Sequence, residues 1–230
     1  MAMTEYPADT DVPKYTDEPV RQIGNVKIWL WELDSLGGSW TQIASLSGEE
    51  RLRAARLKDP NESRRYIASC ILTRRILAGV TGIRPDRLEI LVDKCGKPFL
   101  MSSTIDHSGR KPRFNISHSE NLLCIAVGEG CEIGVDIEVV KADTDVLAIS
   151  NASLDPVSIG IIERCSSEER AFVFYRTWTE REAFAKMQGH RMGSDHLQPM
   201  PAGSWREEIL DFTVDEKRVL GSLAVRPLAE

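Results

Sequence analysis

The sequence predicts an α+β protein built from two similar α/β halves. Apolar, β-branched runs alternate with stretches of helical periodicity, in the order strand, helices, strands, then strands, helix, strands. The 230 residues, 42% of them hydrophobic, suffice for one large domain or two small ones. We expect an extended N-terminal arm over 1–20, a first half over 21–120 and a second half over 121–230.

The first half should open with a strand and a short helix. Residues 26–33 are β-branched and aromatic, which is typical of a strand. Ser47 and Glu50 form a capping-box signature for a helix that runs to about residue 57. The Asp-Pro pair at 59–60 is expected to end that helix.

A longer helix follows from about residue 62 to residue 78, where four apolar residues recur at helical spacing. Gly79 and Gly82 come directly after it and should stop it. Residues 88–92 then predict a strand, which leads into a turn that presents Lys97 at its tip.

The second half should begin within a β-meander. Apolar runs at 114–117 and 122–127 and the run from Ile133 to Glu138 are separated by turn residues. The polar stretch 141–164 predicts loops with at least one short helix. A periodic helix over 168–188, closed by a glycine, precedes two strand-like runs at the C-terminus.

Charge and composition exclude several classes of function. A formal net charge of −6 argues against a protein that coats nucleic acid. Five scattered cysteines without a CxxC pair suit reduced thiols, and the four histidines form no zinc motif. Any catalytic metal should therefore be a hard cation such as Mg²⁺.

The N-terminal 20 residues are acidic and rich in proline, unlike a signal peptide, and no apolar run approaches the length of a membrane span. We therefore expect a cytoplasmic protein.

The run from Ile133 to Glu138 holds two carboxylates, Asp136 and Glu138, in an apolar strand. Because side chains alternate along a strand, both carboxylates face the same way. They repel each other unless a cation, hydrogen-bond donors or solvent compensates. The alternative is an exposed edge strand with a polar face.

The helix over 168–188 supplies a possible third carboxylate. Tyr175, Trp178 and Glu182 share one face of that helix, and Lys186 lies one turn further along it. Glu182 and Lys186 either form an ordinary surface salt bridge or belong to a functional pair. Three carboxylates would suit octahedral Mg²⁺ completed by water and phosphate oxygens.

A basic cluster adds a candidate anion site, with eight basic and two acidic residues between residues 51 and 75. Solvated helix faces are the alternative for about half of them.

Three segments resemble, in order and spacing, the signatures of the Sfp-type 4′-phosphopantetheinyl transferases. They are FNISHS at 114–119, IGVDIE at 133–138 and WTEREAFAKMQG at 178–189. The resemblance runs from about residue 50 to residue 189. It implies two halves about a pseudo-twofold axis, with coenzyme A in the cleft between them.

The resemblance also implies an activity, namely transfer of the phosphopantetheine arm of coenzyme A to a serine of an apo acyl- or peptidyl-carrier protein, with release of adenosine 3′,5′-bisphosphate. By position, Asp136, Glu138 and Glu182 would hold Mg²⁺ on the pyrophosphate. Glu182, or a water it holds, would deprotonate the serine, and Lys186 would stabilise or protonate the leaving phosphate. His118 would be a third catalytic residue beside Glu182 and Lys186. Further contacts to coenzyme A would come from Ser117, His118, Arg53, Arg56 and Lys97, with Arg65 and Arg74 as further candidates.

Two features depart from the family pattern. Arg181 replaces the usual lysine before the helix glutamate, and the segment 143–165 matches no version that we can place. The carrier protein and pathway, with secondary-metabolite biosynthesis as the expectation, are therefore open. A monomer is expected. A non-catalytic coenzyme A or carrier-binding module and a metal-dependent phosphohydrolase are the alternative functions.

Overall fold

The computed structural model describes residues 18–35, 44–101, 111–192 and 203–228. Its first sheet is antiparallel throughout and has the order β1 (Arg21–Ile23), β2 (Val26–Glu32), β6 (Leu122–Glu129) and β5 (Pro112–Ser119). The second, also antiparallel, has the order β7 (Cys131–Val139), β9 (Lys217–Pro227) and β8 (Arg206–Val214). The strands β3 (Ile90–Val92) and β4 (Pro98–Leu100) pair with each other as a separate two-stranded sheet.

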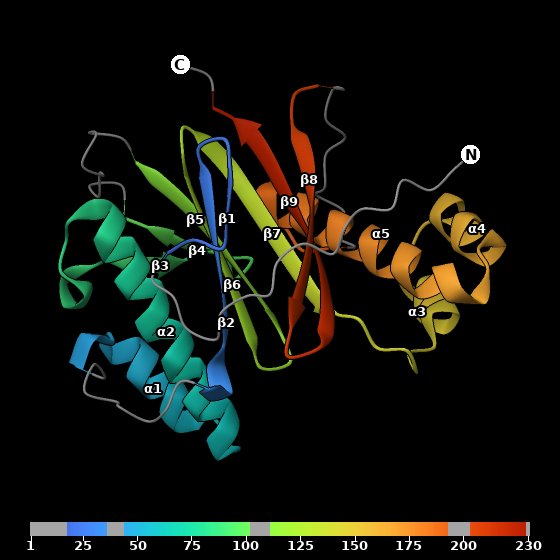
Figure 1. Ribbon diagram of the computed structural model, residues 1–230. Helices are drawn as coiled ribbons and strands as arrows, with labels where there is room; N and C mark the ends of the chain where they lie inside the picture. The colour runs from blue at the N-terminus through green and yellow to red at the C-terminus, as the bar shows by residue number, and fades with distance from the viewer. Residues whose placement is uncertain (1–17, 36–43, 102–110, 193–202, 229–230) are drawn as a thin grey trace.

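The two sheets lie between two groups of helices (Figure 1). The first group is α1 (Gly48–Arg56) and α2 (Pro60–Thr81), and the second is α3 (Val146–Ser153), α4 (Pro156–Arg164) and α5 (Ser167–Met187). Short 3-10 turns follow β2, at Leu33–Ser35, and α2, at Pro85–Arg87.

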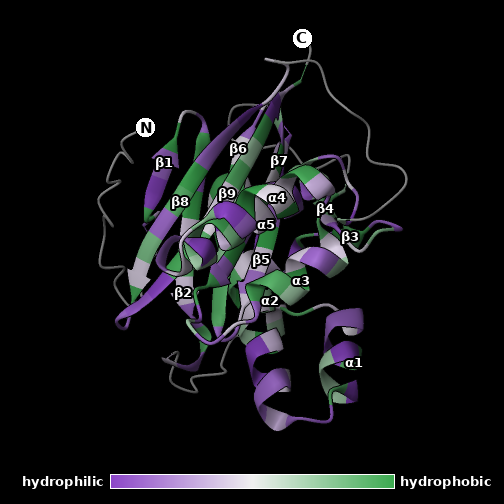
Figure 2. Ribbon diagram, turned by 90° about the vertical axis from the view of Figure 1, so that its right-hand side faces the viewer, coloured by the Kyte–Doolittle hydropathy of each residue, from purple (hydrophilic) through white to green (hydrophobic). Residues whose placement is uncertain are grey.

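Three layers of apolar side chains hold this arrangement together. A central core joins the facing sides of the sheets, through residues such as Ile28 of β2 and Val135 of β7. The outer side of the first sheet packs on α2, and that of the second packs on α5. The strands are accordingly more hydrophobic than the exposed helix α1 (Figure 2). The layering confirms the predicted α+β class, while the pseudo-twofold relation stays a prediction.

The helix signals of the sequence are mostly confirmed. The capping box of Ser47 and Glu50 is formed at the start of α1, and Gly82 ends α2 in the left-handed region, with φ of 71°. The first helix ends at Arg56, before Asp59 and Pro60, as predicted, and these two residues also begin the next helix. Asp59 is the N-cap of α2, because its carboxylate accepts from the Asn61 amide and Pro60 suits the first helical position.

Other elements differ from the expectation because of their tertiary pairing. The meander was wrong in its third strand, since β7 leaves the first sheet after Gly130 and pairs with β9. The predicted boundary at 120/121 falls in the turn between β5 and β6. These two strands pair with each other in the first sheet. Residues 1–17 of the predicted arm lie outside the described residues. The segment 143–165 forms two helices, and all five cysteines are free thiols.

Side chains of β5 close the outer edge of β7. Asn115, Ser117 and Ser119 point in one direction from β5, and their oxygens accept hydrogen bonds from the amides of Val135, Ile137 and Val139, at 2.8, 3.3 and 3.0 Å. An edge strand normally leaves these amides open to solvent or to another chain. Here three polar side chains join the two sheets, and they do so beside the predicted carboxylates.

Candidate active site

Asp136 lies at the centre of the candidate site, on β7. Only 4% of its surface is exposed. Its Oδ1 accepts from Ser117 Oγ at 2.8 Å and from Lys186 Nζ at 2.6 Å, whereas its Oδ2 is buried without a hydrogen-bond partner. Buried carboxylate oxygens are costly unless something pairs with them. The orphaned oxygen therefore marks a place that favours a cation or a donor from a ligand.

Glu138 follows two residues later, on the same face of β7 as Asp136. Its Oε2 accepts from Ser119 Oγ at 2.7 Å. The residue is half-buried and borders a hollow of about 400 Å³. The same-face carboxylate pair predicted from strand alternation is thus present, and each member has a β5 serine beside it.

Helix α5 brings Glu182 and Lys186 to this pair. Lys186 Nζ donates to Asp136, to Ser117 Oγ at 3.2 Å and to the carbonyl of Val135 at 3.3 Å. Glu182 is half-buried and close enough to Asp136 for their charges to interact. Of the two readings of the Glu182 and Lys186 pair, the geometry favours the functional one.

Burial dominates the electrostatics of the carboxylates. Desolvation raises the pKa of Asp136, Glu138 and Glu182 above their ordinary values. The positive charge of Lys186 lowers the pKa of all three carboxylates and so opposes this rise. The negative charge of Asp136 raises the pKa of Glu138 and of Glu182 further. Three mutually repelling carboxylates around one amine suit a site that takes up further positive charge.

The carboxylates of this site offer ligands of the kind that a hard metal ion prefers. Within the described ranges, no three His, Cys, Asp or Glu side chains already converge as a finished metal-binding group. The donor set nevertheless fits Mg²⁺, because it consists of hard carboxylate oxygens and one of them is buried and unpartnered. Asp136 and Glu138 would hold the ion, with Glu182 from α5 as the third candidate.

His118 lies near this site but faces the other way from β5. Its Nε2 lies 2.9 Å from the hydroxyl oxygen of Ser69 on α2. The residue as a whole is exposed, yet its ring lies among protein atoms, and this desolvation lowers the pKa of His118 to about 4. The charges of Lys186 and Arg53 contribute less. Solvent weakens such a shift, but its direction keeps the ring neutral at pH 7.

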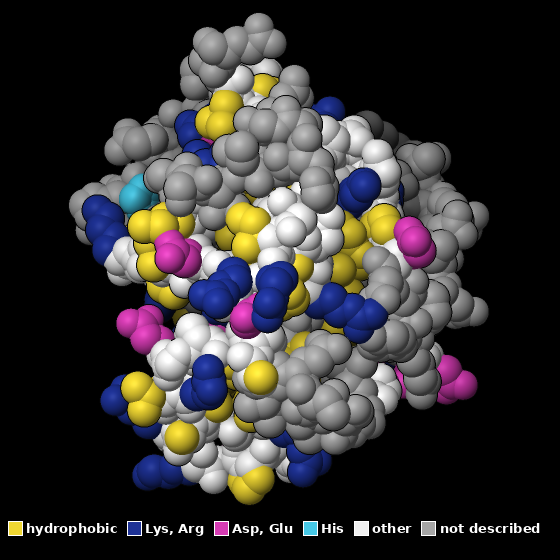
Figure 3. Space-filling view, turned by 90° about the vertical axis from the view of Figure 1, so that its left-hand side faces the viewer, with side chains coloured by type: hydrophobic (Ala, Val, Ile, Leu, Met, Phe, Trp, Pro, Cys, Tyr) yellow, Lys and Arg dark blue, Asp and Glu magenta, His cyan; other side chains and the backbone are white. Residues whose placement is uncertain are grey.

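A hollow of about 370 Å³ opens beside His118, between the helices of the first half and the β3–β4 hairpin. Arg53 of α1 lines it and stacks over the ring of Tyr66, with 5.0 Å between guanidinium and ring centre. On the side of the molecule that carries α1 and α2, lysine and arginine side chains are spread with hydrophobic ones among them (Figure 3). The lining combines this guanidinium with an aromatic ring and apolar residues such as Ile90 and Ile116, which suits a nucleotide.

The other three residues predicted to contact coenzyme A differ in how accessible their side chains are. Arg56 is exposed in the last turn of α1. Lys97 does not extend from its turn, because its Nζ donates to the carbonyls of Ile133 at 2.9 Å and Lys186 at 2.6 Å. Ser117 is buried, and its hydroxyl already bonds to Asp136 and Lys186.

Two arginines from the basic cluster have structural partners. Arg74 is only 2% exposed and bonds to Glu50 and to the carbonyls of Pro85 and Leu88, so its candidacy as a phosphate contact was wrong. Arg65 pairs with Asp34 at 2.5 Å. Residue type alone does not distinguish a buried structural arginine from a free one.

Sequence reasoning missed three residues. Ser119 bonds to the Glu138 carboxylate, Asn115 bonds to the edge of β7, and Ser69 bonds to His118. The signal available for the first two was the alternation of polar residues along β5, with Asn115, Ser117 and Ser119 each two positions apart.

Arg181, which departs from the family pattern, turns away from the carboxylates. Its guanidinium pairs with Asp155, the N-cap of α4, and donates to Ser158 Oγ at 3.0 Å. Arg181 therefore anchors α4 to α5. Among the described helices, none is long and apolar enough to cross a membrane.

Comparison with known proteins agrees with this architecture. Two family models match the chain: "4′-phosphopantetheinyl transferase, N-terminal" over residues 35–129 and "4′-phosphopantetheinyl transferase superfamily" over residues 132–218. The division between them falls at Gly130, where the first sheet ends and β7 begins.

Curated relatives carry the same name. The chain is 31% identical over 165 residues to the 4′-phosphopantetheinyl transferase HetI of Nostoc sp., covering 71% of this chain and 68% of the relative. It is 27% identical over 155 residues to a 4′-phosphopantetheinyl transferase of Bacillus subtilis, covering 67% and 65%. The chain thus spans about two thirds of the length of these relatives. This chain belongs to the 4′-phosphopantetheinyl transferase superfamily.

Proposed function

We propose that this transferase uses Mg²⁺, held by Asp136, Glu138 and Glu182, to move the 4′-phosphopantetheine arm of coenzyme A to a serine of an apo carrier protein. The observation that carries the proposal is Asp136, which is buried and has one carboxylate oxygen without a hydrogen-bond partner. Glu138 lies on the same face of β7, and α5 brings Glu182 and Lys186 beside Asp136. A site of this charge suits a pyrophosphate and its metal ion.

The reaction breaks one phosphorus–oxygen bond and forms another. The serine oxygen attacks the phosphorus that carries the pantetheine, and the bond from that phosphorus to the bridging oxygen breaks. Adenosine 3′,5′-bisphosphate leaves with the bridging oxygen, and the serine proton passes to Glu182. Desolvation raises the pKa of Glu182, and a more basic carboxylate is a better proton acceptor.

Lys186 stabilises the charge that develops on the leaving phosphate, because its amine already lies among the groups that surround the carboxylates. Arg53 and the neutral ring of His118 contact the nucleotide end of coenzyme A in the hollow that both line. The bound ion would supply neutralisation of the pyrophosphate. The more exposed Arg56 would add a contact to coenzyme A. Lys97 and Ser117 are already engaged with protein groups and would support the site from within.

The test is an intact-protein mass measurement on a panel of apo carrier proteins, incubated with enzyme, coenzyme A and Mg²⁺. We expect one carrier to gain the mass of one phosphopantetheine, and EDTA or Glu182→Gln to abolish the gain. Folded enzyme that modifies no carrier would contradict the activity. Full transfer in EDTA would contradict the metal requirement alone.

The alternatives named above find no support among the relatives, which are named as transferases. Cytoplasmic location, a monomeric state and a role in secondary metabolism stay proposals, and sedimentation of the pure protein would test the monomer.

A further inference from the structure

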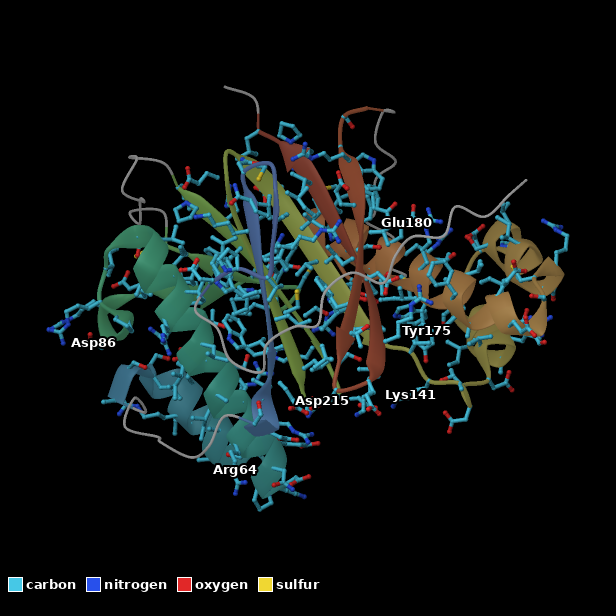
Figure 4. The ribbon with its side chains drawn as sticks, in the orientation of Figure 1. Arg64, Asp86, Lys141, Tyr175, Glu180 and Asp215 are labelled. Atoms are coloured by element: carbon cyan, nitrogen blue, oxygen red, sulfur yellow. The ribbon has the colours of Figure 1, made fainter. Side chains whose placement is uncertain are left out.

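Lys97 belongs to the first half of the chain but bonds to the second half. Its turn joins β3 to β4, yet its amine donates to the carbonyl of Ile133 on β7 and to that of Lys186 on α5, at 2.9 and 2.6 Å. The helices of the two halves lie on opposite sides of the sheets, as Arg64 of α2 and Tyr175 of α5 show (Figure 4). The Lys97 side chain therefore crosses from one half to the other beside the candidate site.

The turn that carries Lys97 is held in place by further bonds. Within the turn, a carboxylate oxygen of Asp93 accepts from the amides of Cys95 and Lys97, at 2.8 and 2.9 Å. From the second half, Arg191 donates to the carbonyl of Cys95 at 3.0 Å, and a Cβ on Gly96 would lie 3.1 Å from the same guanidinium. The turn therefore packs closely against the residues that follow α5, which gives the Lys97 side chain a firm base.

The bond from Lys97 acts on the last turn of α5, where a helix leaves carbonyls without partners inside the helix. The Lys186 carbonyl accepts from the Lys97 amine and from the Gly189 amide, the latter at 3.1 Å. A positive charge at this end of a helix is favourable in addition. Because Lys186 extends its own amine to Asp136, at 2.6 Å, Lys97 fixes the backbone from which that amine extends. Ile133 lies on the same strand as Asp136, so Lys97 joins the two elements that carry the site.

A direct contact between the Lys97 amine and the ligand is the competing role. Gly96 and Pro98, on either side of Lys97, line the hollow of about 370 Å³ proposed for the nucleotide. Within the described ranges, Lys97 itself is not part of that lining. An amine that turned to the ligand would also give up both of its hydrogen bonds to the protein. The turn therefore offers one side to the nucleotide, while the amine supports α5 on the other.

We propose that Lys97 is a positioning residue of the transfer reaction, which clamps the last turn of α5 to β7 and so holds the amine of Lys186 where the leaving phosphate develops charge. The inference rests on the proposed function, because it takes Lys186 as the group that stabilises that phosphate. Without the clamp the end of the helix shifts, and a misplacement of about 1 Å can slow a reaction by about a hundredfold. The nucleotide hollow does not include this amine, so affinity for coenzyme A should be retained.

Lys97→Met tests the clamp by separating turnover from binding. In Mg²⁺, kcat in the carrier mass assay should fall about tenfold, while the Kd of coenzyme A from isothermal titration should change by less than about twofold. The matched control is Lys94→Met, which removes an exposed lysine of the same turn and should change neither quantity. An unchanged kcat, or a Kd that rises about tenfold, would overturn the proposal, the second because it assigns the amine to the ligand.

A double-mutant cycle distinguishes positioning from a general loss of structure. Lys186→Met removes the group through which Lys97 is proposed to act. Adding Lys97→Met to that variant should therefore lower its single-turnover rate by less than about a further twofold. Losses that multiply would show that Lys97 acts independently of Lys186, against the proposal.

Arg191→Met provides a second variant if Lys97→Met does not fold. It breaks the bond between the exposed Arg191 and the carbonyl of Cys95, and it should lower kcat about threefold at an unchanged Kd. The charge of Arg191 lowers the pKa of Glu182, so its loss makes that base stronger and does not account for a slower reaction. An unchanged kcat in this variant would count against the clamp.

Hydrogen exchange tests the clamp without turnover and separates it from the proposed function. The amides of Gly189 and His190, which bond to the last turn of α5, should exchange about tenfold faster in Lys97→Met than in the wild type. The amide of Arg170, at the start of the helix, should not change. Equal exchange at Gly189 in both proteins would overturn the clamp. If exchange behaves as expected but the wild type modifies no carrier, the proposed function fails while the clamp stands.

Discussion

Lys186 occupies the position beside Asp136 where a cation is needed. Its amine lies 2.6 Å from Oδ1, and the side chain of Asp136 is 6% exposed against 25% for the lysine. A buried carboxylate that loses its only positive partner is left with an uncompensated charge. In the absence of a metal ion, Lys186 therefore holds the carboxylates together, in addition to its proposed role toward the leaving phosphate.

Replacement of Lys186 by methionine should therefore destabilise the protein in EDTA by about 3 kcal/mol, measured by urea unfolding. Mg²⁺ should raise the melting temperature of the variant more than that of the wild type, because the ion takes the place of the lost amine. Lys217→Met removes a partner of the exposed Glu120 and should cost less than about 1 kcal/mol. Equal responses of Lys186→Met and wild type to Mg²⁺ would contradict this role.

Lys97 is a second largely buried amine, and within the described part of the chain it donates to the carbonyls of Ile133 and Lys186. Desolvation lowers the pKa of Lys97 from 10.5 to about 8. Glu132 and Asp93 oppose this change without cancelling it. A neutral amine still has two hydrogens, so both bonds persist after deprotonation.

The sign of the resulting pH dependence follows from that lowered pKa. Between about pH 8 and pH 10.5 the folded chain has released the Lys97 proton and the unfolded chain still binds it. The contribution of Lys97 to stability should therefore increase as pH rises through this window and be smallest below pH 8. Urea unfolding of wild type and Lys97→Met should show a free-energy difference that changes across the window. A constant difference would rule out the lowered pKa.

At the scale of elements, the contact of α5 with β7 fixes the geometry of the site. Gly134 lies where the helix crosses the strand, and a Cβ there would overlap the carbonyl oxygen of Ala183 and the amide nitrogen of Met187. Because both are backbone atoms, the helix itself would have to move. Glu182 and Lys186 lie on that stretch of helix and would move with it.

Gly134→Ala should therefore cost about 2 kcal/mol of stability and reduce kcat/KM for transfer by about a hundredfold. Thermal unfolding and the carrier mass assay would measure the two effects. Gly79→Ala is the control, because its Cβ would meet nothing within 4 Å and a helical alanine stabilises by about 0.5–1 kcal/mol. Normal activity of a folded Gly134→Ala variant would show that the helix position is not critical.

Local chemistry explains which elements the sequence could predict. Ser47, Glu50 and Gly82 act within one turn of their own helix, so their signals were reliable. The partner of β7 could not be predicted, because alternation defines the faces of a strand but not its neighbours. The three-residue strands β1 and β4 are too short for a periodic signal.

The same distinction applies to the site. Asp136 and Glu138 were identifiable because charges are rare within an apolar strand. The buried positions of Arg74 and Lys97 depend on distant carbonyls, such as those of Leu88 and Ile133, that no local pattern encodes.

At the scale of the whole molecule, the two sheets are joined by hydrogen bonds from side chains of β5 to the backbone of β7. Asn115, Ser117 and Ser119 take the place of a neighbouring strand along β7. Ser117 and Ser119 also bond to Asp136 and Glu138, so the junction of the halves and the carboxylate site share the same residues. Opening the junction would disperse the site.

Asn115→Leu should loosen that junction without touching the carboxylates. It leaves the buried amide of Val135 without its partner, at a cost of about 2 kcal/mol. Hydrogen exchange at Val135 should accelerate relative to Ala126 on β6. Gln22→Leu, which alters an exposed amide on β1, should change stability by less than about 0.5 kcal/mol. Unchanged exchange at Val135 in the Asn115 variant would contradict the role of this side chain.

The pairing of Arg181 with Asp155 has a consequence for protein engineering. Helices α3 and α4 lie between the end of β7 and the start of α5, and each has its own N-cap, Asp145 and Asp155. They can be treated as a cassette that the guanidiniums of Arg181 and Arg170 attach to α5. A chimera that imports this cassette from a relative should therefore exchange residue 181 together with it.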